Sequence, residues 1–459
     1  MNAEARTLWL AERLTDYATH YGVPGAVAAI HHDGRSYEVA TGTLNAATRV
    51  AVTRDSLFQI GSITKTFTAT LVLQLVERGR VRLDDPVRLH LPWFAVASED
   101  VTRSVTLRHL LTHTSGIDGD FFPDTGADSD CIEKYVRACA GLGQVHAPDE
   151  CVSYCNAAFI VLGAMLEHIT GQTWGALLQQ RILQPLGLTR STADYAQLPL
   201  YRVAVGHLPN KETKQLEVAR RIHLPRGMGP TGSTLHMSAG DLASFGKAFL
   251  EGGQAPDGTR ILDAQTVALS REVYATWPTS PWTGMAMGLG WLLYAWDGRS
   301  VFGHDGATIG QASYLRIMPD ANLVVTLLTN GGPAKNLYNA LFRDIFAELA
   351  DTQLPQPPKI MDPSAFDAAR VIGTYENKST VARILLAGGE LRVQTTVREL
   401  TDVVSGETWP LVPIAPNACR IANPATETAE LAVFHHFDAG AGRARFATLN
   451  HRDLLRRDS

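Results

Sequence analysis

A proline-rich segment divides the chain into two stretches of different character. Residues 352–366, TQLPQPPKIMDPSAF, show little periodicity, and proline disrupts both helix and sheet interiors. Such a segment is typical of a linker. Helical and strand-like patterns are mixed before it, whereas short alternating runs follow it, as in a small β-barrel or sandwich. We therefore expect a large α/β body over residues 1–351, a linker over 352–366 and a β-rich module over 367–459.

The net charge limits the expected binding partners, and the cysteines indicate the redox environment of the protein. The net charge is −5 and no basic block occurs, so neither nucleic acid nor an anionic membrane is an expected partner. Five scattered cysteines without a CxxC pair favour reduced thiols over a disulfide framework. Residues 1–22 contain no apolar run long enough for a signal peptide, and no apolar stretch is long enough for a membrane span. We expect a cytoplasmic protein.

A serine and a lysine stand together where residues 59–80 change from a turn-like pattern to that of an amphipathic helix. Because positions i and i+3 share a helix face, Lys65 can reach the hydroxyl of Ser62. The pair alone has two interpretations, a helix cap beside a solvated lysine or a nucleophile beside its base. Taken alone, the pair favours the cap.

Two further motifs follow in order and favour the second interpretation. Tyr154 and Asn156 precede a helical pattern, and His304 and Gly306 lie where a strand meets glycines. Between the motifs run LLTHTSGI at 110–117 and GPTGSTLHMSAGDLASF at 229–245. With these marks, about residues 10–350 resemble the serine β-lactamase and penicillin-binding-protein superfamily. The likeness is to the branch of class C β-lactamases, DD-carboxypeptidases, D-aminopeptidases and related esterases.

The resemblance implies a fold and a set of functional residues. The fold is an α/β (α+β) domain with an antiparallel sheet flanked by helices, followed by an all-β lipocalin-like barrel. The backbone amides of Ser62 and Ala307 are expected to form the oxyanion hole, and Gly306 is expected to contact the substrate. No cofactor and no metal are expected. The expected catalytic residues are Ser62, Lys65, Tyr154, Asn156 and His304.

Two residues are candidates for the base that activates Ser62. Lys65 can accept a proton only when neutral, and an ordinary lysine titrates near 10.4. Burial and the positive end of its own helix would lower that pKa. Tyr154 is the second candidate, because cations at Lys65 and His304 would favour its phenolate. The sequence leaves this choice open, while Asn156 is suited to orient Lys65 and a substrate amide.

The third motif narrows the expected reaction. The β-lactamases of this branch carry lysine at the position of His304. The histidine resembles that of the peptidases and esterases. The layout also resembles stand-alone penicillin-binding-protein-type thioesterases, which release and macrocyclise nonribosomal peptides. We therefore expect Ser62 to take a peptidyl group with a D-configured C-terminal residue from a thioester, delivered by a carrier protein. A D-stereospecific aminopeptidase or carboxylesterase, and a β-lactam-binding sensor without turnover, are the alternatives.

Several other polar residues have a structural and a functional interpretation. His109 and His113 lie one helical turn apart, but without a nearby acidic ligand a structural role is favoured over a metal site. His435 and His436 are expected to alternate across a strand. Arg443 and Arg445 share one face of a C-terminal strand, where a surface pair is favoured and a contact with a substrate carboxylate is the alternative. Cys155 is interpreted as a variable position within its motif, in preference to a reactive thiol.

Overall fold

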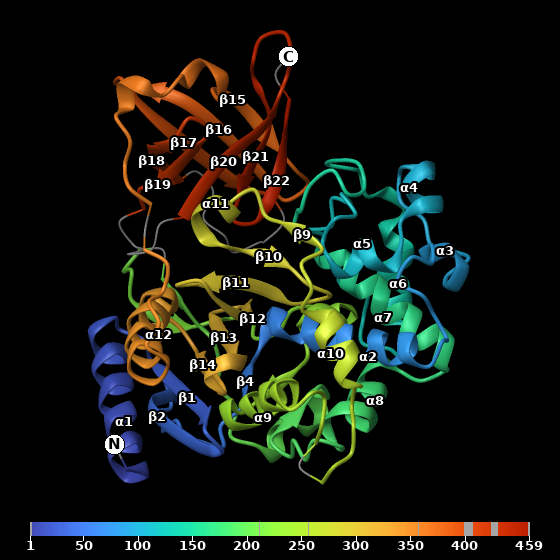
Figure 1. Cartoon of the computed structure of the whole chain (residues 1–459), viewed down its shortest axis with the longest axis vertical. Helices are drawn as coiled ribbons and strands as arrows, with labels where there is room; N and C mark the ends of the chain where they lie inside the picture. The colour runs from blue at the N-terminus through green and yellow to red at the C-terminus, as the bar shows by residue number, and fades with distance from the viewer. Residues whose placement is uncertain are drawn as a thin grey trace.

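A nine-stranded antiparallel sheet forms the centre of the body (Figure 1). The computed structural model describes residues 2–210, 212–255, 257–356, 358–398, 407–423 and 430–457. The strand order in the sheet is β3-β2-β1-β14-β13-β12-β11-β10-β9. The strands are β1 (Gly25–His32), β2 (Arg35–Asn45), β3 (Val50–Ala51), β9 (Ala275–Thr276), β10 (Ala286–Met287), β11 (Leu292–Trp296), β12 (Arg299–Thr308), β13 (Gln311–Met318) and β14 (Leu323–Thr329).

The central strands are apolar because both faces of the sheet are covered. Every residue of β1 and of β14 is buried, and alternate residues of β1 belong to two separate hydrophobic clusters. Helices α1 (Ala3–His20) and α12 (Ala334–Ala350) pack on one face. On the other lie α2 (Thr64–Glu77), α7 (Asn156–Thr170) and α9 (Ala239–Leu250). The sheet is therefore the middle layer of three.

Shorter elements complete the body. Strands β4 (Phe58–Gln59), β8 (His236–Met237) and β5 (Ser191–Thr192) form one small sheet, and β6 (His207–Pro209) pairs with β7 (Leu216–Val218). The remaining α-helices are α3 (Val87–His90), α4 (Glu99–Ser104), α5 (Leu107–Leu111), α6 (Cys131–Ala138), α8 (Trp174–Leu178), α10 (Ala264–Ser270) and α11 (Ser280–Thr283). Among the described residues, no helix is both long and apolar enough to cross a membrane.

The C-terminal part is a closed antiparallel barrel in which each strand pairs with the next and β15 pairs with β22. It lies beside the end of the body that carries β9, β10 and α11 (Figure 1). Closure leaves no unpaired strand edge. The strands are β15 (Gly373–Glu376), β16 (Thr380–Ala387), β17 (Glu390–Val397), β18 (Glu407–Ala415), β19 (Ala418–Ile421), β20 (Glu430–Phe437), β21 (Ala444–Leu449) and β22 (Arg452–Arg456).

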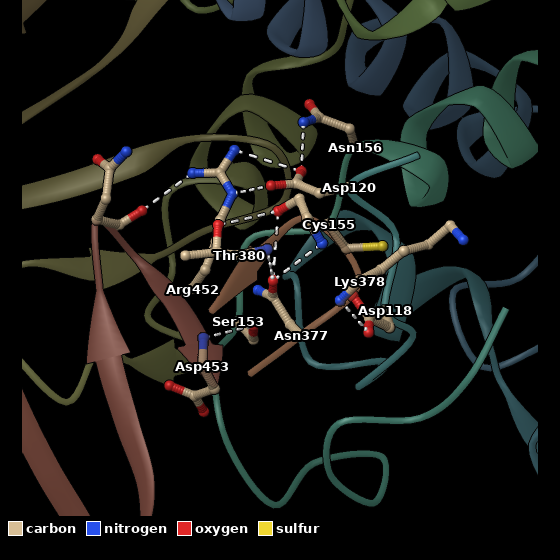
Figure 2. Close-up of polar contacts among 12 residues, drawn as sticks. Asp118, Asp120, Ser153, Cys155, Asn156, Asn377, Lys378, Thr380, Arg452 and Asp453 are labelled. Carbon is tan, nitrogen blue, oxygen red and sulfur yellow. Dashed lines mark hydrogen bonds and ion pairs between the residues drawn. The ribbon is translucent and has the colours of Figure 1, made fainter. Parts of the chain in front are cut away.

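Turns of the barrel bond directly to the body (Figure 2). The backbone N–H of Lys378 donates to the Asp118 carboxylate over 2.7 Å, and the N–H of Asp453 donates to Ser153 Oγ over 3.0 Å. The body in turn donates from the backbone N–H of Tyr154 to the carbonyl of His451 over 2.9 Å. These contacts hold the β21–β22 turn against the residues around Tyr154.

Candidate active site

Ser62 and Lys65 lie on adjoining turns at the buried start of α2. Ser62 belongs to a 3-10 turn, η1 (Gly61–Ile63), which continues into the helix. Lys65 Nζ is 2.9 Å from Ser62 Oγ, and the lysine is completely buried. The hydroxyl and the amine are therefore in hydrogen-bond contact without an intervening group.

Two further acceptors surround the Lys65 amine. Lys65 Nζ donates to Asn156 Oδ1 over 2.9 Å and to the carbonyl of Thr231 over 3.0 Å. Burial, followed by the charge of Arg452, holds the pKa of Lys65 well below its usual range. A neutral amine has two N–H bonds for these two acceptors and one lone pair, which then faces the Ser62 hydroxyl. This geometry suits proton transfer from serine to lysine.

A chain of polar contacts runs from the barrel to Lys65, and Figure 2 shows its part from Arg452 through Asp120 to Asn156. The guanidinium of Arg452 pairs with the carboxylate of Asp120, which accepts a hydrogen bond of 2.8 Å from Asn156 Nδ2. A carboxylate only accepts, so Asp120 fixes the amide nitrogen of Asn156 on its own side. The amide oxygen of Asn156 consequently faces Lys65 Nζ.

Tyr154 lies beside the Lys65 amine and the Arg452 guanidinium, but its surroundings do not favour the phenolate. Its ring centre is 4.8 Å from Lys65 Nζ and 5.0 Å from the guanidinium carbon of Arg452. Burial nevertheless raises the pKa of Tyr154 above its ordinary value. Burial and the charge of Lys65 also lower the pKa of His304 to about 3, which favours its neutral imidazole. The described groups favour Lys65 over Tyr154 as the base.

His304 presents one ring nitrogen to the candidate site. Its Nδ1 is 2.6 Å from the carbonyl of Asp305, while Nε2 is buried and has no hydrogen-bond partner among the described residues. The neighbouring Asp305 carboxylate pairs with the fully buried Arg316 over 2.7 Å. This ion pair anchors the end of β12 beside the imidazole.

Two backbone segments approach closely around the predicted oxyanion hole. A Cβ on Gly306 would lie 1.9 Å from the carbonyl oxygen of Ile60, and one on Gly61 would lie 2.6 Å from the backbone nitrogen of Ala307. Ser313 Oγ donates to the carbonyl of Ile60 over 2.7 Å. Only glycine fits this approach, which places Ala307 beside the turn that carries the serine.

The predicted catalytic residues meet at a cavity of about 560 Å³ that the body and the barrel share. The turn residues Asn450, His451 and Arg452 form part of its wall, and Lys65 lies buried behind the serine. Among the predicted site residues, those that line the cavity are Ser62, Tyr154, Asn156, His304, Gly306 and Ala307. No described residue suggests a cofactor or a metal within this cavity.

The two arginines proposed from the C-terminal strand do not line the cavity. Arg445 pairs with Glu150 over 2.6 Å on the surface, and Arg443 lines a separate surface depression. The arginine that reaches the site is Arg452, seven residues after Arg445, at the start of the next strand. Leu449-Asn450-His451-Arg452 has the length of a two-residue hairpin turn, which was the available sequence signal.

His109 and His113 do not lie one helical turn apart, because α5 ends at Leu111 and His113 has φ of 57°; they make separate structural contacts. His113 is fully buried, and its Nδ1 accepts the backbone N–H of Cys155 over 3.1 Å. His109 instead accepts the N–H of Thr106 at Nδ1 over 3.0 Å and meets Asp149 at Nε2 over 2.9 Å. The Asp120 carboxylate, which sequence reasoning missed, lies three residues after the end of the LLTHTSGI segment.

Comparison with known proteins relates the chain to one family. A family model described as beta-lactamase matches residues 10–348. Penicillin-binding protein 4 of Amycolatopsis lactamdurans is 45% identical over 372 residues, which cover 80% of this chain and 97% of that protein.

Solved structures extend the likeness beyond the body. The crystal structure of SurE is 25% identical, with a TM-score of 0.77 over 99% of both chains. A D-stereospecific amidohydrolase from Streptomyces sp. is also 25% identical, with a TM-score of 0.59, and covers 75% of this chain and 99% of its own. The similarity to SurE therefore spans the barrel as well as the body.

Proposed function

The chain belongs to the β-lactamase and penicillin-binding-protein superfamily of serine hydrolases and acyltransferases, and on this premise we propose that it is a peptidyl thioesterase. In this proposal it releases a peptide from a carrier-bound thioester and closes it into a ring. The cavity shared by Ser62 and the β21–β22 turn is the observation that carries the proposal.

The proposed reaction has two acyl transfers. Ser62 Oγ passes its proton to neutral Lys65 and attacks the thioester carbonyl, the C–S bond breaks, and the thiol leaves with a proton from Lys65. The amides of Ser62 and Ala307 stabilise the oxyanion, and His304 Nε2 contacts the substrate. The peptide's own amine then attacks the ester carbonyl, a C–N bond forms as the C–O bond to Ser62 breaks, and Lys65 carries the proton from the amine to Ser62 Oγ.

Ring closure requires that the amine reach the acyl-serine before water does. A cavity closed partly by Asn450, His451 and Arg452 supports this requirement, because a folded peptide would displace water from it. An open surface site would leave the ester accessible to hydrolysis. The barrel therefore acts in this proposal as a wall of the acyl-enzyme pocket.

A preference for a D-configured C-terminal residue is the finer part of the proposal. The similarity to a D-stereospecific amidohydrolase supports it. The buried Nε2 of His304 and the backbone around Gly306 offer fixed contacts on one side of the acyl group. Contacts fixed on one side can distinguish a D- from an L-configured residue. Only one of the two configurations then places its carbonyl carbon correctly for attack by Ser62.

Intact-protein mass spectrometry with paired thioesters tests the proposed function. Peptidyl thioesters that differ only in a D- or L-configured C-terminal residue would be incubated with the full chain and with Ser62→Ala. We expect an adduct on the wild type with the D-substrate, no adduct on the variant, and cyclic product over time. Linear acid as the sole product, or faster turnover of simple esters and D-aminoacyl amides, would contradict ring closure and favour a hydrolase.

Stable acylation by β-lactams is a second candidate function. The 45% identity to a penicillin-binding protein over 97% of its length favours it. A fluorescent penicillin would then label Ser62 in the full chain and remain attached, while peptidyl thioesters would give no product. Release of the penicillin, or turnover of the thioesters, would exclude a sensor without turnover.

A further inference from the structure

Three side chains with metal-binding atoms meet where the body contacts the barrel, outside the lining of the catalytic cavity. Cys151 precedes the Tyr154 motif in the body, whereas His435 and His436 lie in β20 of the barrel. One ligand atom from each lies within 4.8 Å of the others. Cys151 Sγ is 3.8 Å from His436 Nδ1, and the two Nδ1 atoms of the histidines are 2.8 Å apart.

The backbone of β20 turns the two histidines toward each other. Consecutive strand residues ordinarily point to opposite faces, and the sequence predicts this for His435 and His436. In the structure His436 has φ of 52°, although the flanking residues His435 and Phe437 remain paired with β21. A residue other than glycine seldom adopts this left-handed conformation, which is strained for it. The predicted alternation is therefore wrong, and a strained residue brings both rings together, as occurs at functional sites.

The contacts behind His435 fix which of its nitrogens is free. His435 Nε2 lies 2.8 Å from Thr448 Oγ1 and 3.3 Å from the carboxylate of Asp453, which is completely buried. A carboxylate accepts only, so the proton of the neutral ring belongs on Nε2. The lone pair of His435 Nδ1 then points toward His436. A buried carboxylate behind a histidine is the usual support of a metal-bound imidazole.

The electrostatic surroundings of Cys151 favour a cation. The carboxylates of Asp453 and Glu150 both act on the Cys151 thiol through their negative charge. Glu150 is held by Arg445, and Asp453 lies behind His435. The negative field that disfavours an isolated thiolate would attract a metal ion, which stabilises the thiolate directly.

We propose that Cys151, His435 and His436 bind one zinc-class divalent metal ion that ties the barrel to the body. One sulfur and two imidazole ligands suit zinc and its neighbours, with solvent at a fourth position. On binding, the S–H bond of Cys151 breaks, its electron pair forms the S–metal bond, and the proton passes to solvent. A cavity of about 520 Å³ lined by Cys151 and both histidines gives access. This site departs from the expectation of no metal.

The observed spacing is close to that of a tetrahedral site. Zinc bond lengths place two imidazole nitrogens about 3.3 Å apart and a sulfur about 3.6 Å from each nitrogen. The corresponding separations are 2.8 Å between the histidines and 3.8 Å from Cys151 to His436. Small rotations of the exposed His436 side chain would lengthen the distance between the two histidine nitrogens and shorten the distance from His436 to the Cys151 sulfur. The third separation, between the ligand atoms of Cys151 and His435, is at most 4.8 Å, so metal binding must also bring these two side chains closer together.

Cobalt binding to the chelator-treated full chain tests this site. We expect one equivalent of Co²⁺ to give a thiolate-to-cobalt charge-transfer absorption that Zn²⁺ abolishes by displacement. Cys151→Ser should lose this band although four cysteines remain, and His436→Ala should weaken Zn²⁺ binding more than about tenfold in competition with a chromophoric chelator. His168→Ala, which removes a histidine from α7, is the matched control and should bind as the wild type.

Thermal unfolding supplies a second readout that does not depend on catalysis. Zn²⁺ should raise the unfolding temperature of the wild type and of His168→Ala, and should leave Cys151→Ser and His436→Ala unchanged. His436 is exposed, so His436→Ala keeps the test valid where Cys151→Ser folds poorly. A charge-transfer band that persists in Cys151→Ser, or equal Zn²⁺ affinity in wild type and His436→Ala, would overturn the proposal.

Discussion

The charge of Lys65 depends on a side chain from the opposite end of the chain. Arg452 is close enough to lower the pKa of Lys65, adding to the effect of burial, while Asp120 opposes it. The same arginine holds Asp120, which orients Asn156 against the lysine amine. One residue of the barrel therefore affects both the protonation and the position of the candidate base.

Replacement of Arg452 should change the pH dependence of acylation. Lys65 must be neutral to accept the Ser62 proton, so the rate falls below its pKa. Arg452→Gln removes a nearby positive charge and leaves the Asp120 carboxylate, which raises that pKa. We expect the acidic limb of the kcat/KM profile to move up by about one pH unit.

Arg445 offers the matched control, because it pairs with Glu150 on the surface. Arg445→Gln should leave the limb where it is in the wild type. The rate of Ser62 acylation would be followed by mass spectrometry across pH. An unchanged limb in Arg452→Gln would mean that this charge does not act on Lys65.

At the scale of elements, α2 differs from the amphipathic helix that its sequence suggests. Its residues from Thr64 to Leu75 are all buried. Three of its four threonines are tolerated inside because their hydroxyls find backbone acceptors: Thr66 donates to Ile63, Thr68 to Pro230 and Thr70 to Thr66. The polar residues of α2 thus resembled a solvent-exposed face in the sequence. In the structure the helix runs through the interior, and Lys65 is therefore shielded from water.

The approach of β12 to the turn before α2 should be sensitive to one methyl group. Gly306→Ala places a Cβ against the Ile60 carbonyl, and relief of the clash must move the segment that leads to Ser62. We expect acylation to slow at least about tenfold, equivalent to about 1.4 kcal/mol of barrier, and the free energy of unfolding to fall by about 1–3 kcal/mol.

Gly175→Ala is the comparison for that variant, since Gly175 lies in α8 and a Cβ there meets open space. It should keep the wild-type acylation rate and gain up to about 1 kcal/mol of stability. Burst kinetics and denaturant unfolding measure the two quantities. Equal acylation rates in both variants would show that the close approach is not needed for the chemistry.

For the molecule as a whole, the candidate site exists only where the barrel meets the body. Ser62, the Tyr154 motif and β12 supply one part of the cavity, and the β21–β22 turn supplies another. His451 also contacts the buried ring of Trp277, with 5.1 Å between ring centres. The barrel thereby forms part of the catalytic compartment.

Removal of the His451 side chain should change the product and leave the nucleophile intact. His451 has φ of 63°, which glycine adopts freely, so His451→Gly keeps the backbone bond to Tyr154 and opens the cavity wall. We expect the Ser62 acylation rate to stay within about twofold and the ratio of linear acid to cyclic peptide to rise at least about tenfold through water entry. Product ratios by chromatography measure this, and an unchanged ratio would argue against the barrel as a barrier to water.

The sequence by itself determined the local features of this protein. Alternating runs after residue 366 predicted a small β-barrel or sandwich, because alternation records which face of a strand is buried. The resemblance implied the antiparallel sheet of the body, and the structure has this sheet and a closed barrel. The order of three short motifs identified the superfamily. The spacing of Ser62 and Lys65 predicted their contact, because one helical turn brings positions i and i+3 together.

Only the tertiary structure decided which distant groups share one environment. The pKa of His304 falls because of burial and a charge far away in sequence, and no pattern within β12 contains that information. Arg452 reaches Asp120, whereas Arg445 pairs with Glu150, because closure of the barrel fixes which strand ends face the body. Local periodicity determines the faces of an element, but long-range packing determines what each face meets.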